Sequence, residues 1–303
     1  MIVLVGGDGF LGRHITHMAS ARGLDVLVVS RACQDGLRLP GVRHAHANDL
    51  QSGTLNEDLI AASMVVYLAS ASVPVSNTEQ PDQELFANVQ PVMRTASLLA
   101  ILGSKAKFIY FSSGGTVYGR GHTQPIPETA QIAPISPYGL GKAQAELAIE
   151  YLGRVSALRY AVLRLGNPVG RWQQSQRQGL LGIALRCLAE RKPLQLFGDG
   201  HNLRDYFDAD DAAELVLKLN AWTFKESGTW NVGSGVGTGE LELLEKVQSI
   251  TGKKLEIQRL PPRAVDLRYA VLDVRKAARD FNWSSQTHLH DTIGEIVRQT
   301  TRT

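Results

Sequence analysis

Tyr138 and Lys142 are the pair whose chemistry and spacing stand out first. They lie in a stretch with helical periodicity, where four residues make about one turn, so the phenol and the ammonium group share one face. A neighbouring cation favours the phenolate form of a tyrosine, whose pKa is otherwise near 10. A pKa lowered by about three units, or roughly 4 kcal/mol, would make Tyr138 an acid–base group at neutral pH. A tyrosine and a lysine four residues apart are common in helices, so this spacing indicates an active site only together with neighbouring motifs.

Hydroxyl side chains follow a short apolar run earlier in the chain. The segment 111–119 reads Phe-Ser-Ser-Gly-Gly-Thr-Val-Tyr-Gly and contains Ser112, Ser113 and Thr116. Ligands of parallel α/β sheets bind at the carboxyl ends of the strands. We therefore expect these hydroxyl groups to line a ligand site together with Tyr138.

A glycine-rich turn links the first predicted strand to the first predicted helix. Gly6, Gly9 and Gly12 permit a tight turn, approach of the backbone to a pyrophosphate, and close helix–strand packing. The first predicted helix, which this turn opens, offers N-terminal N–H groups and a partial positive charge to phosphates, and Phe10 and Leu11 of the turn are candidate cofactor contacts. The alternative is a simple strand–turn–helix junction, but the position after an N-terminal strand predicts a dinucleotide site. A positive nicotinamide ring would also favour the phenolate of Tyr138.

The end of the second predicted strand bears on the choice between NAD and NADP as cofactor. Ser30-Arg31 stands where an acidic residue usually binds the ribose 2′-hydroxyl of NAD. A small hydroxyl followed by arginine can accept the 2′-phosphate of NADP, so the sequence slightly favours NADP; the alternative is a solvated loop arginine. Asp49, followed by Leu50, could bring a carboxylate to the adenine amino group or could cap a helix.

Alternating strand and helix patterns would position these residues. Short β-branched runs predict buried parallel strands at 2–5, 26–29, 64–68, 108–111 and 161–165. Apolar residues at helical spacing predict helices at 12–22, 83–102 and 138–152. This alternation predicts an α/β fold with a doubly wound parallel sheet (Rossmann) and helices on both faces.

Beyond residue 167 the alternation loosens and indicates a second unit. Helices are predicted at 179–191, 209–220, 240–251 and 291–299, and strands near 230–232 and 255–259. We expect a dinucleotide-binding domain at 1–166 and 206–235, and a smaller, chain-interleaved α+β substrate domain at 167–205 and 236–303. The site would lie between them.

The composition excludes several classes of protein. The 303 residues are 44% hydrophobic and 20% charged, which is typical of a globular chain and not of a disordered one or a coiled coil. A net charge of +3 without a basic stripe predicts neither a nucleic-acid nor a membrane partner. Cys33 and Cys187 predict reduced thiols and no metal site. The absence of a signal-peptide pattern after Met1 predicts a cytoplasmic protein.

Taken together, the motifs resemble the extended short-chain dehydrogenases/reductases of the nucleotide-sugar epimerase/dehydratase family, which includes UDP-galactose 4-epimerase. The resemblance covers nearly the whole chain, and the order of the motifs is its most specific feature. Besides the glycine turn, the hydroxyl segment and the Tyr138/Lys142 pair, the motifs are Tyr67-Leu68-Ala69-Ser70, Asn88, 164–170, Gly198-Asp199-Gly200, Arg204-Asp205-Tyr206, Asn231-Val232-Gly233 and 262–266, ending near Trp283.

The resemblance implies roles for individual residues. Tyr138 would be the acid–base group, and Lys142 would hold the nicotinamide ribose and lower the pKa of Tyr138. Further cofactor contacts would come from Leu68, Ala69, Ser70, Asn88, Ser112 and Pro168. The nucleotide sugar would be held by Ser113, Gly114, Asn167, Leu180, Arg204, Arg263 and Asp266. Arginine fits this role because it binds phosphate through two parallel hydrogen bonds; the alternatives are a surface ion pair of Arg204 with Asp205 and an ordinary loop charge at Arg263.

Two positions depart from the family pattern. The usual catalytic serine or threonine is replaced by Gly114, so Ser113, Thr116 or water must supply the hydroxyl, and we favour Ser113. The Asp-Glu pair of the 4,6-dehydratases is replaced by Gly115 and Thr116, which disfavours dehydration.

These features predict an NAD(P)-dependent nucleotide-sugar epimerase, specifically a UDP-hexose 4-epimerase that acts through a 4-keto intermediate. The first alternative is an NADPH-dependent reductase of a nucleotide-linked 4-keto sugar, favoured by Ser30-Arg31. A non-catalytic NADP-binding regulator is the second, and the intact Tyr138/Lys142 pair counts against it. The family resemblance also implies a homodimer formed through two helices.

Overall fold

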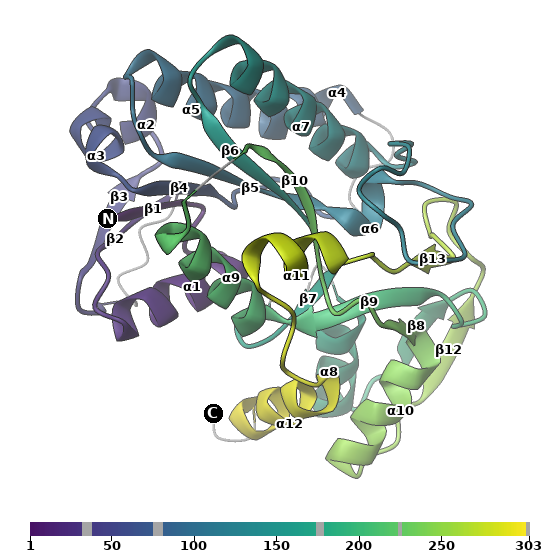
Figure 1. Cartoon of the computed structure of the whole chain (residues 1–303). Coiled ribbons are helices and arrows are strands. Elements are labelled where there is room, and N and C mark those ends of the chain that lie inside the picture. The colour runs from purple at the N-terminus through teal and green to yellow at the C-terminus, as the bar shows by residue number, and fades with distance from the viewer. Residues whose placement is uncertain (32–37, 75–80, 174–178, 224–225, 301–303) are drawn as a thin grey trace.

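A seven-stranded parallel sheet is the centre of the computed structural model, which describes residues 1–31, 38–74, 81–173, 179–223 and 226–300 (Figure 1). The strand order is β10-β6-β5-β4-β1-β2-β3, so the order reverses between β1 and β4. The strands are β1 (Ile2–Val5), β2 (Val26–Ser30), β3 (Val42–His46), β4 (Met64–Tyr67), β5 (Lys107–Ser113), β6 (Arg159–Leu165) and β10 (Gly228–Val232). The predicted doubly wound α/β fold is confirmed.

Helices cover both faces of this sheet because the buried strands are apolar on both sides (Figure 1). Ile2 and Leu4 pack toward α1, α9 and α11, whereas Val3 and Val5 pack toward α3, α5 and α7. The helices and the π-helical turn η1 are α1 (Phe10–Ala21), α2 (Asp49–Ser52), α3 (Asn56–Ala61), α4 (Pro81–Glu84), η1 (Leu85–Val89), α5 (Gln90–Ile101), α6 (Gly114–Val117), α7 (Pro137–Val155), α9 (Ala209–Ala221) and α11 (Arg275–Phe281).

A smaller unit lies beside the carboxyl ends of the main strands (Figure 1). In one small sheet β9 (Leu203–Asp208) pairs with β7 (Asn167–Val169), β11 (Gly237–Gly239) and β13 (Tyr269–Ala270), and β8 (Leu194–Phe197) pairs separately with β12 (Ile257–Leu260). Their apolar side chains share a core with α8 (Leu180–Glu190), α10 (Glu240–Thr251) and α12 (Leu289–Thr300). The chain crosses between the units several times, and Phe281 and Trp283 pack into the core of the large sheet.

The structure contains several short elements that the sequence did not predict, and it divides one predicted helix; the unpredicted elements are α2, α3, α6, α11, β3, β7, β8, β9, β11 and β13. Strands β3 and β9 were not predicted, because Arg43, His44, Arg204 and Asp205 interrupt the apolar pattern there. The predicted helix over 83–102 is divided by the π-helical turn η1.

Two further observations concern membranes and metals. No helix among the described residues is long and apolar enough to cross a bilayer. Within the same part of the chain, no group of three or more metal-binding side chains comes together. Cys187 is a buried free thiol, and Cys33 lies outside the described residues.

Candidate active site

The glycine turn lies at the point where the strand order reverses, between β1 and β4. Gly6 has a φ of +88°, and a Cβ on it would lie 2.6 Å from the backbone nitrogen of Ala69. A Cβ on Gly12 would lie 2.4 Å from the carbonyl oxygen of Gly7, so the turn requires glycine at both positions. Leu68 and Ala69 both donate through their backbone N–H groups to the carbonyl of Val5, which joins the ends of β4 and β1.

The N-terminus of α1 is available to an anionic ligand. Gly9 is its N-cap and has no side-chain capping hydrogen bond, and Phe10 and Leu11 form the first turn. Such uncapped N–H groups bind phosphate readily, and the crevice at a reversal of strand order is where dinucleotides bind. The residues therefore fit a dinucleotide whose pyrophosphate rests on α1.

Ser30, Arg31 and Asp49 occupy the neighbouring ends of β2 and β3. Ser30 is buried and donates a short hydrogen bond to the carboxylate of Asp8, a residue that the sequence analysis did not single out. Arg31 is exposed, and its carbonyl oxygen lies 3.1 Å from His46 Nε2. Asp49 accepts from the backbone N–H of His46 at 2.9 Å and is the first residue of α2, followed by Leu50; the N-cap of this helix is Asn48, so Asp49 does not cap it.

The Tyr138/Lys142 pair stands on the first turns of α7. The helix begins there because Pro137 occupies its first position and the Ser136 hydroxyl accepts from the Gly139 N–H at 3.2 Å. Lys142 is buried and donates from Nζ to the carbonyl of Phe111 at 2.8 Å. Its Nζ lies 5.6 Å from the centre of the Tyr138 ring, so α7 places both side chains beside the end of β5.

The electrostatics of Tyr138 differ from the sequence prediction. Burial, followed by the negative charge of Glu84, raises the pKa of Tyr138 above its usual value. The predicted lowering by Lys142 is therefore wrong for the polypeptide alone, because lost hydration and a nearby carboxylate outweigh the lysine. Burial also lowers the pKa of Lys142 to about 8, while Glu146 and Glu84 oppose that shift.

Glu84 is a buried carboxylate that the sequence analysis missed. Asn88 Nδ2 donates to its Oε2 at 2.5 Å, and the Ser72 hydroxyl donates to the same atom at 2.9 Å. Asn88 Oδ1 in turn accepts from the Ala71 N–H at 2.7 Å, with Ser70 Oγ at 3.5 Å. In the sequence, an acidic residue one helical turn before Asn88 is the feature that could have indicated this cluster. This cluster anchors the loop after β4 against α4 and η1, next to Tyr138.

The hydroxyl groups at the end of β5 and in α6 have different surroundings. Ser112 donates a short hydrogen bond to Glu146, which is also held by Arg164 at 2.6 Å, so Ser112 belongs to a buried structural network. Ser113 is half-buried. The Thr116 hydroxyl is buried and has no hydrogen-bond partner among the described residues.

Gly114 lies beneath a fully buried leucine from the last third of the chain. A Cβ on Gly114 would lie 2.6 and 2.7 Å from the two methyl carbons of Leu272 and 3.2 Å from the carbonyl of Arg164. Leu272 therefore occupies the space into which the side chain of a serine or threonine at position 114 would extend.

Ser113 and Asn167 both lie close to Gly115 in α6. A Cβ on Gly115 would lie 3.6 Å from Asn167 Oδ1 and 3.9 Å from Ser113 Oγ, so both polar groups face one point. Pro168 follows in β7, where it pairs with Phe207, and Leu180 opens α8 next to a segment outside the described residues.

The predicted substrate-binding residues of the second unit gather around Glu240. Arg204 Nη1 donates to the carbonyls of Leu203 and Leu267 at 2.9 and 2.6 Å. Burial raises the pKa of the Glu240 carboxyl, and the positive charges of Arg204 and Arg263 oppose that shift. Both guanidinium groups therefore lie close enough to Glu240 to act on its charge. Glu240 stands at the start of α10 in no distinctive pattern, so the sequence did not point to it.

Arg263 and Asp266 form a local pair beside an aromatic ring. Arg263 donates from Nε and Nη2 to the two carboxylate oxygens of Asp266 at 3.0 and 2.8 Å, and its guanidinium lies 4.4 Å from the centre of the Phe197 ring. The alternative pairing of Arg204 with Asp205 is wrong, because Asp205 is fully buried and accepts from Ser234, Gly235 and Leu272 instead.

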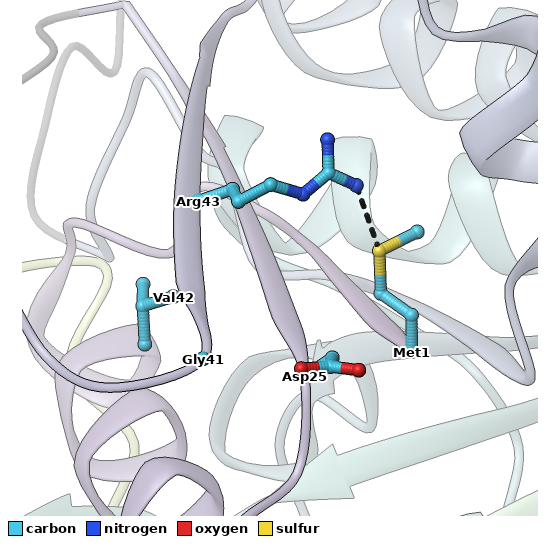
Figure 2. A pocket seen from close by; sticks show the side chains of 5 residues that line it. All are labelled: Met1, Asp25, Gly41, Val42 and Arg43. Atoms are coloured by element: carbon cyan, nitrogen blue, oxygen red, sulfur yellow. Dashed lines mark hydrogen bonds between the residues drawn. The ribbon is translucent and has the colours of Figure 1, made fainter.

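A surface pocket of about 360 Å³ lies elsewhere, at the amino ends of β1, β2 and β3 (Figure 2). It is lined by Met1, Asp25, Gly41, Val42 and Arg43, and Arg43 Nη2 lies 3.2 Å from Met1 Sδ. These residues are at the end of the sheet opposite the glycine turn, so the pocket takes no part in the candidate site.

Comparisons with known proteins agree with this geometry. The chain is 26% identical over 320 residues to a UDP-glucose 4-epimerase of Streptococcus mutans serotype c, covering 98% of this chain and 94% of that protein. It is also 26% identical to a dTDP-4-dehydro-6-deoxyglucose reductase of Escherichia coli, over 77% of this chain and 73% of that one. A solved UDP-glucose 4-epimerase of Thermus thermophilus, in complex with NAD, is 30% identical and covers 99% of both chains with a TM-score of 0.87.

The sequence model of the NAD dependent epimerase/dehydratase family matches residues 2–233. That match confirms the predicted resemblance and the prediction that the chain is an NAD(P)-dependent enzyme. The chain therefore belongs to the NAD-dependent epimerase/dehydratase family.

Proposed function

We propose that this enzyme is a UDP-hexose 4-epimerase that uses NAD(P) and acts through a 4-keto sugar. The observation that carries the proposal is the Tyr138/Lys142 pair, which α7 holds at the carboxyl end of β5. When bound, the cofactor supplies a reversible two-electron oxidation of the sugar at C4.

Tyr138 is the proton-transfer group in this proposal. Its Oη takes the proton of the sugar 4-hydroxyl during oxidation and returns it when the 4-keto group is reduced on its other face. Burial and Glu84 favour the protonated phenol, whereas the ammonium of Lys142 favours the phenolate. Ser113 supplies the neighbouring hydroxyl, since it is half-buried and next to Asn167, whereas the Thr116 hydroxyl is enclosed.

The nucleotide end of the substrate is assigned to the second unit. Arg204, Arg263 and Asp266 hold the diphosphate and the nucleoside, while the keto sugar turns about the diphosphate and presents its other face. Two guanidinium groups suit this role because charge-assisted hydrogen bonds to phosphate are strong and directional. In this proposal residues 1–166 and 206–235 bind the cofactor, and residues 167–205 and 236–303 bind the sugar nucleotide.

The test compares Tyr138→Phe with the control Tyr160→Phe, which removes a hydroxyl at the amino end of β6. We expect Tyr138→Phe to bind the cofactor normally and to lose at least about a hundredfold in turnover of UDP-glucose or UDP-galactose, because only the proton-transfer group is removed. Full activity in this variant would refute the proposed mechanism. Tyr160→Phe should retain wild-type turnover.

A reductase of a nucleotide-linked 4-keto sugar is the second candidate, favoured by Ser30-Arg31 and by the similarity to the Escherichia coli reductase. The two candidates differ in their use of cofactor. An epimerase retains its cofactor and regenerates it in each cycle, whereas a reductase consumes NADPH in stoichiometric amounts. Measuring NADPH consumption and the nucleotide released on denaturation distinguishes them.

We also propose that the enzyme is a homodimer formed through α5 and α7. Large apolar side chains are exposed on these two helices, which lie along one face of the molecule (Figure 1). They include Met93 and Ile101 on α5, and Leu147, Tyr151 and Val155 on α7. Exposed apolar side chains on neighbouring helices favour association. We also propose that the protein is cytoplasmic, and cell fractionation tests this location.

A further inference from the structure

Asp8 places a carboxylate inside the glycine turn, between Gly7 and Gly9. Its side chain is only 11% exposed. The backbone oxygen of Asp8 accepts from Arg13 Nε at 3.0 Å, so the observed hydrogen bond from Arg13 is to the main chain and not to the carboxylate. A carboxylate in a phosphate-binding turn opposes phosphate binding, because it adds negative charge where anionic phosphates bind. Its presence is explained if it binds another part of the same ligand.

One of the two carboxylate oxygens of Asp8 accepts a hydrogen bond, and the other accepts none from the described residues. The Ser30 hydroxyl at the end of β2 donates to Asp8 Oδ2. Asp8 Oδ1 is buried and accepts no hydrogen bond from the described residues; a ring nitrogen on β3, His44 Nδ1, lies 4.0 Å away. The turn therefore holds, beside the end of β2, a carboxylate oxygen whose hydrogen-bonding capacity is not used by the described residues.

The end of β2 is where the adenosine ribose of a dinucleotide lies in folds of this kind, and a carboxylate there binds the ribose hydroxyls of NAD. This chain has no acidic residue at 30 or 31. We propose that Asp8 supplies this carboxylate from the glycine turn and so selects NAD over NADP. The ribose hydroxyl donates to Asp8 Oδ1, whereas the 2′-phosphate of NADP would bring a second anion against it.

This assignment reverses the preference for NADP drawn from Ser30-Arg31. The Ser30 hydroxyl directs its hydrogen to Asp8 and is therefore not the phosphate donor that the sequence suggested. Arg31 is exposed, and its attraction for a phosphate is weakened by solvent. The inference rests on the dinucleotide binding of the proposed function but not on the identity of the sugar.

The test measures binding and not turnover. Purified protein is freed of bound nucleotide, and titration calorimetry gives the dissociation constants of NAD⁺ and NADP⁺ for the wild type, Asp8→Asn and Asp8→Ala. Asparagine preserves the shape and the acceptor for Ser30 but removes the charge. The control is Asp25→Asn, which changes a carboxylate at the opposite end of β2, in the pocket of Figure 2.

We expect the wild type and Asp25→Asn to bind NAD⁺ at least about tenfold more tightly than NADP⁺. Asp8→Asn should reduce this preference by about tenfold or more, mainly through tighter NADP⁺ binding. Asp8→Ala should also release a larger share of NADP than the wild type when heat-denatured after expression. An unchanged preference in both Asp8 variants, or a wild type that prefers NADP⁺, overturns the inference while the proposed function stands. Failure of the wild type to bind either dinucleotide overturns both.

Discussion

Replacing Gly114 with serine restores the residue type usual at this position in the family, and we expect it to destabilise this protein. The new Cβ would lie 2.6 and 2.7 Å from the methyl carbons of Leu272, well inside van der Waals contact. Leu272 cannot easily withdraw, since it is fully buried with Val117, Tyr118 and Ile126. Its backbone N–H donates to Asp205, and its neighbours Val271 and Asp273 are hydrogen-bonded to Ile126.

The expected cost follows from this overpacking. Forcing extra atoms into a packed core costs about 1–3 kcal/mol, which for a chain of this size lowers the melting temperature by roughly 2–6 °C. Leu272→Ala alone leaves a cavity and costs about 2–5 kcal/mol. In the double variant the serine fills part of that cavity, so its loss should be smaller than the two single losses together by about 1–2 kcal/mol.

Thermal and urea denaturation of the two single variants and the double variant provide the assay. Gly115→Ser is the matched control, because its Cβ would meet only Asn167 Oδ1 at 3.6 Å and Ser113 Oγ at 3.9 Å, which are ordinary contacts. It should change stability by less than about 0.5 kcal/mol. A Gly114→Ser protein as stable as the wild type, or strictly additive losses in the double variant, would show that Leu272 does not exclude a side chain at 114.

Other perturbations test other parts of the site. Lys142→Met should stabilise the protein by up to about 3 kcal/mol below pH 8, because burial lowers the pKa of Lys142 to about 8 in the folded protein. Between pH 8 and about 10 the folded wild type releases this proton while the unfolded chain keeps it, so the wild type becomes more stable and the advantage of the variant shrinks. Urea titrations at several pH values measure this difference. Steady-state rates should fall much more for Ser113→Ala than for Thr116→Ala, and the opposite order would transfer the catalytic hydroxyl to Thr116. Arg263→Ala should weaken UDP binding by about 1.5–3 kcal/mol in calorimetry, and unchanged affinity would remove it from the site. Leu147→Glu should convert a dimer to a monomer in light scattering, since it puts a charge on the exposed apolar surface of α7, and a persistent dimer would place the interface elsewhere.

The large sheet could be predicted because its strands are continuous apolar runs. The predicted strand at 2–5 coincides with β1, and the predicted helix at 240–251 coincides with α10. The small sheet could not be predicted, because β9 carries Arg204 and Asp205, whose partners are distant in sequence. Arg204 donates to the carbonyl of Leu267, and Asp205 accepts from Ser234 and Leu272. Local patterns do not contain such partners.

The same distinction applies to the candidate site. Tyr138 and Lys142 were found by their spacing within one helix, and the glycine turn by its place after a strand. Glu84, Asp8 and Leu272 were missed, because each acquires its importance from a neighbour brought close only by folding. The pKa of Tyr138 could not be foreseen for that reason: its direction is set by burial and by Glu84 from a preceding helix.

The late position of β10 in the chain has a consequence for protein synthesis. This strand completes the sheet by pairing with β6 over residues 228–232, after the whole segment 166–227 has been made. At translation rates of about 5–20 residues per second, β6 waits on the order of several seconds as an unpaired edge, and such edges recruit other chains. The nascent polypeptide therefore depends on chaperones or on the prompt emergence of its own second half, and rare codons between 166 and 227 would raise aggregation without changing a single residue.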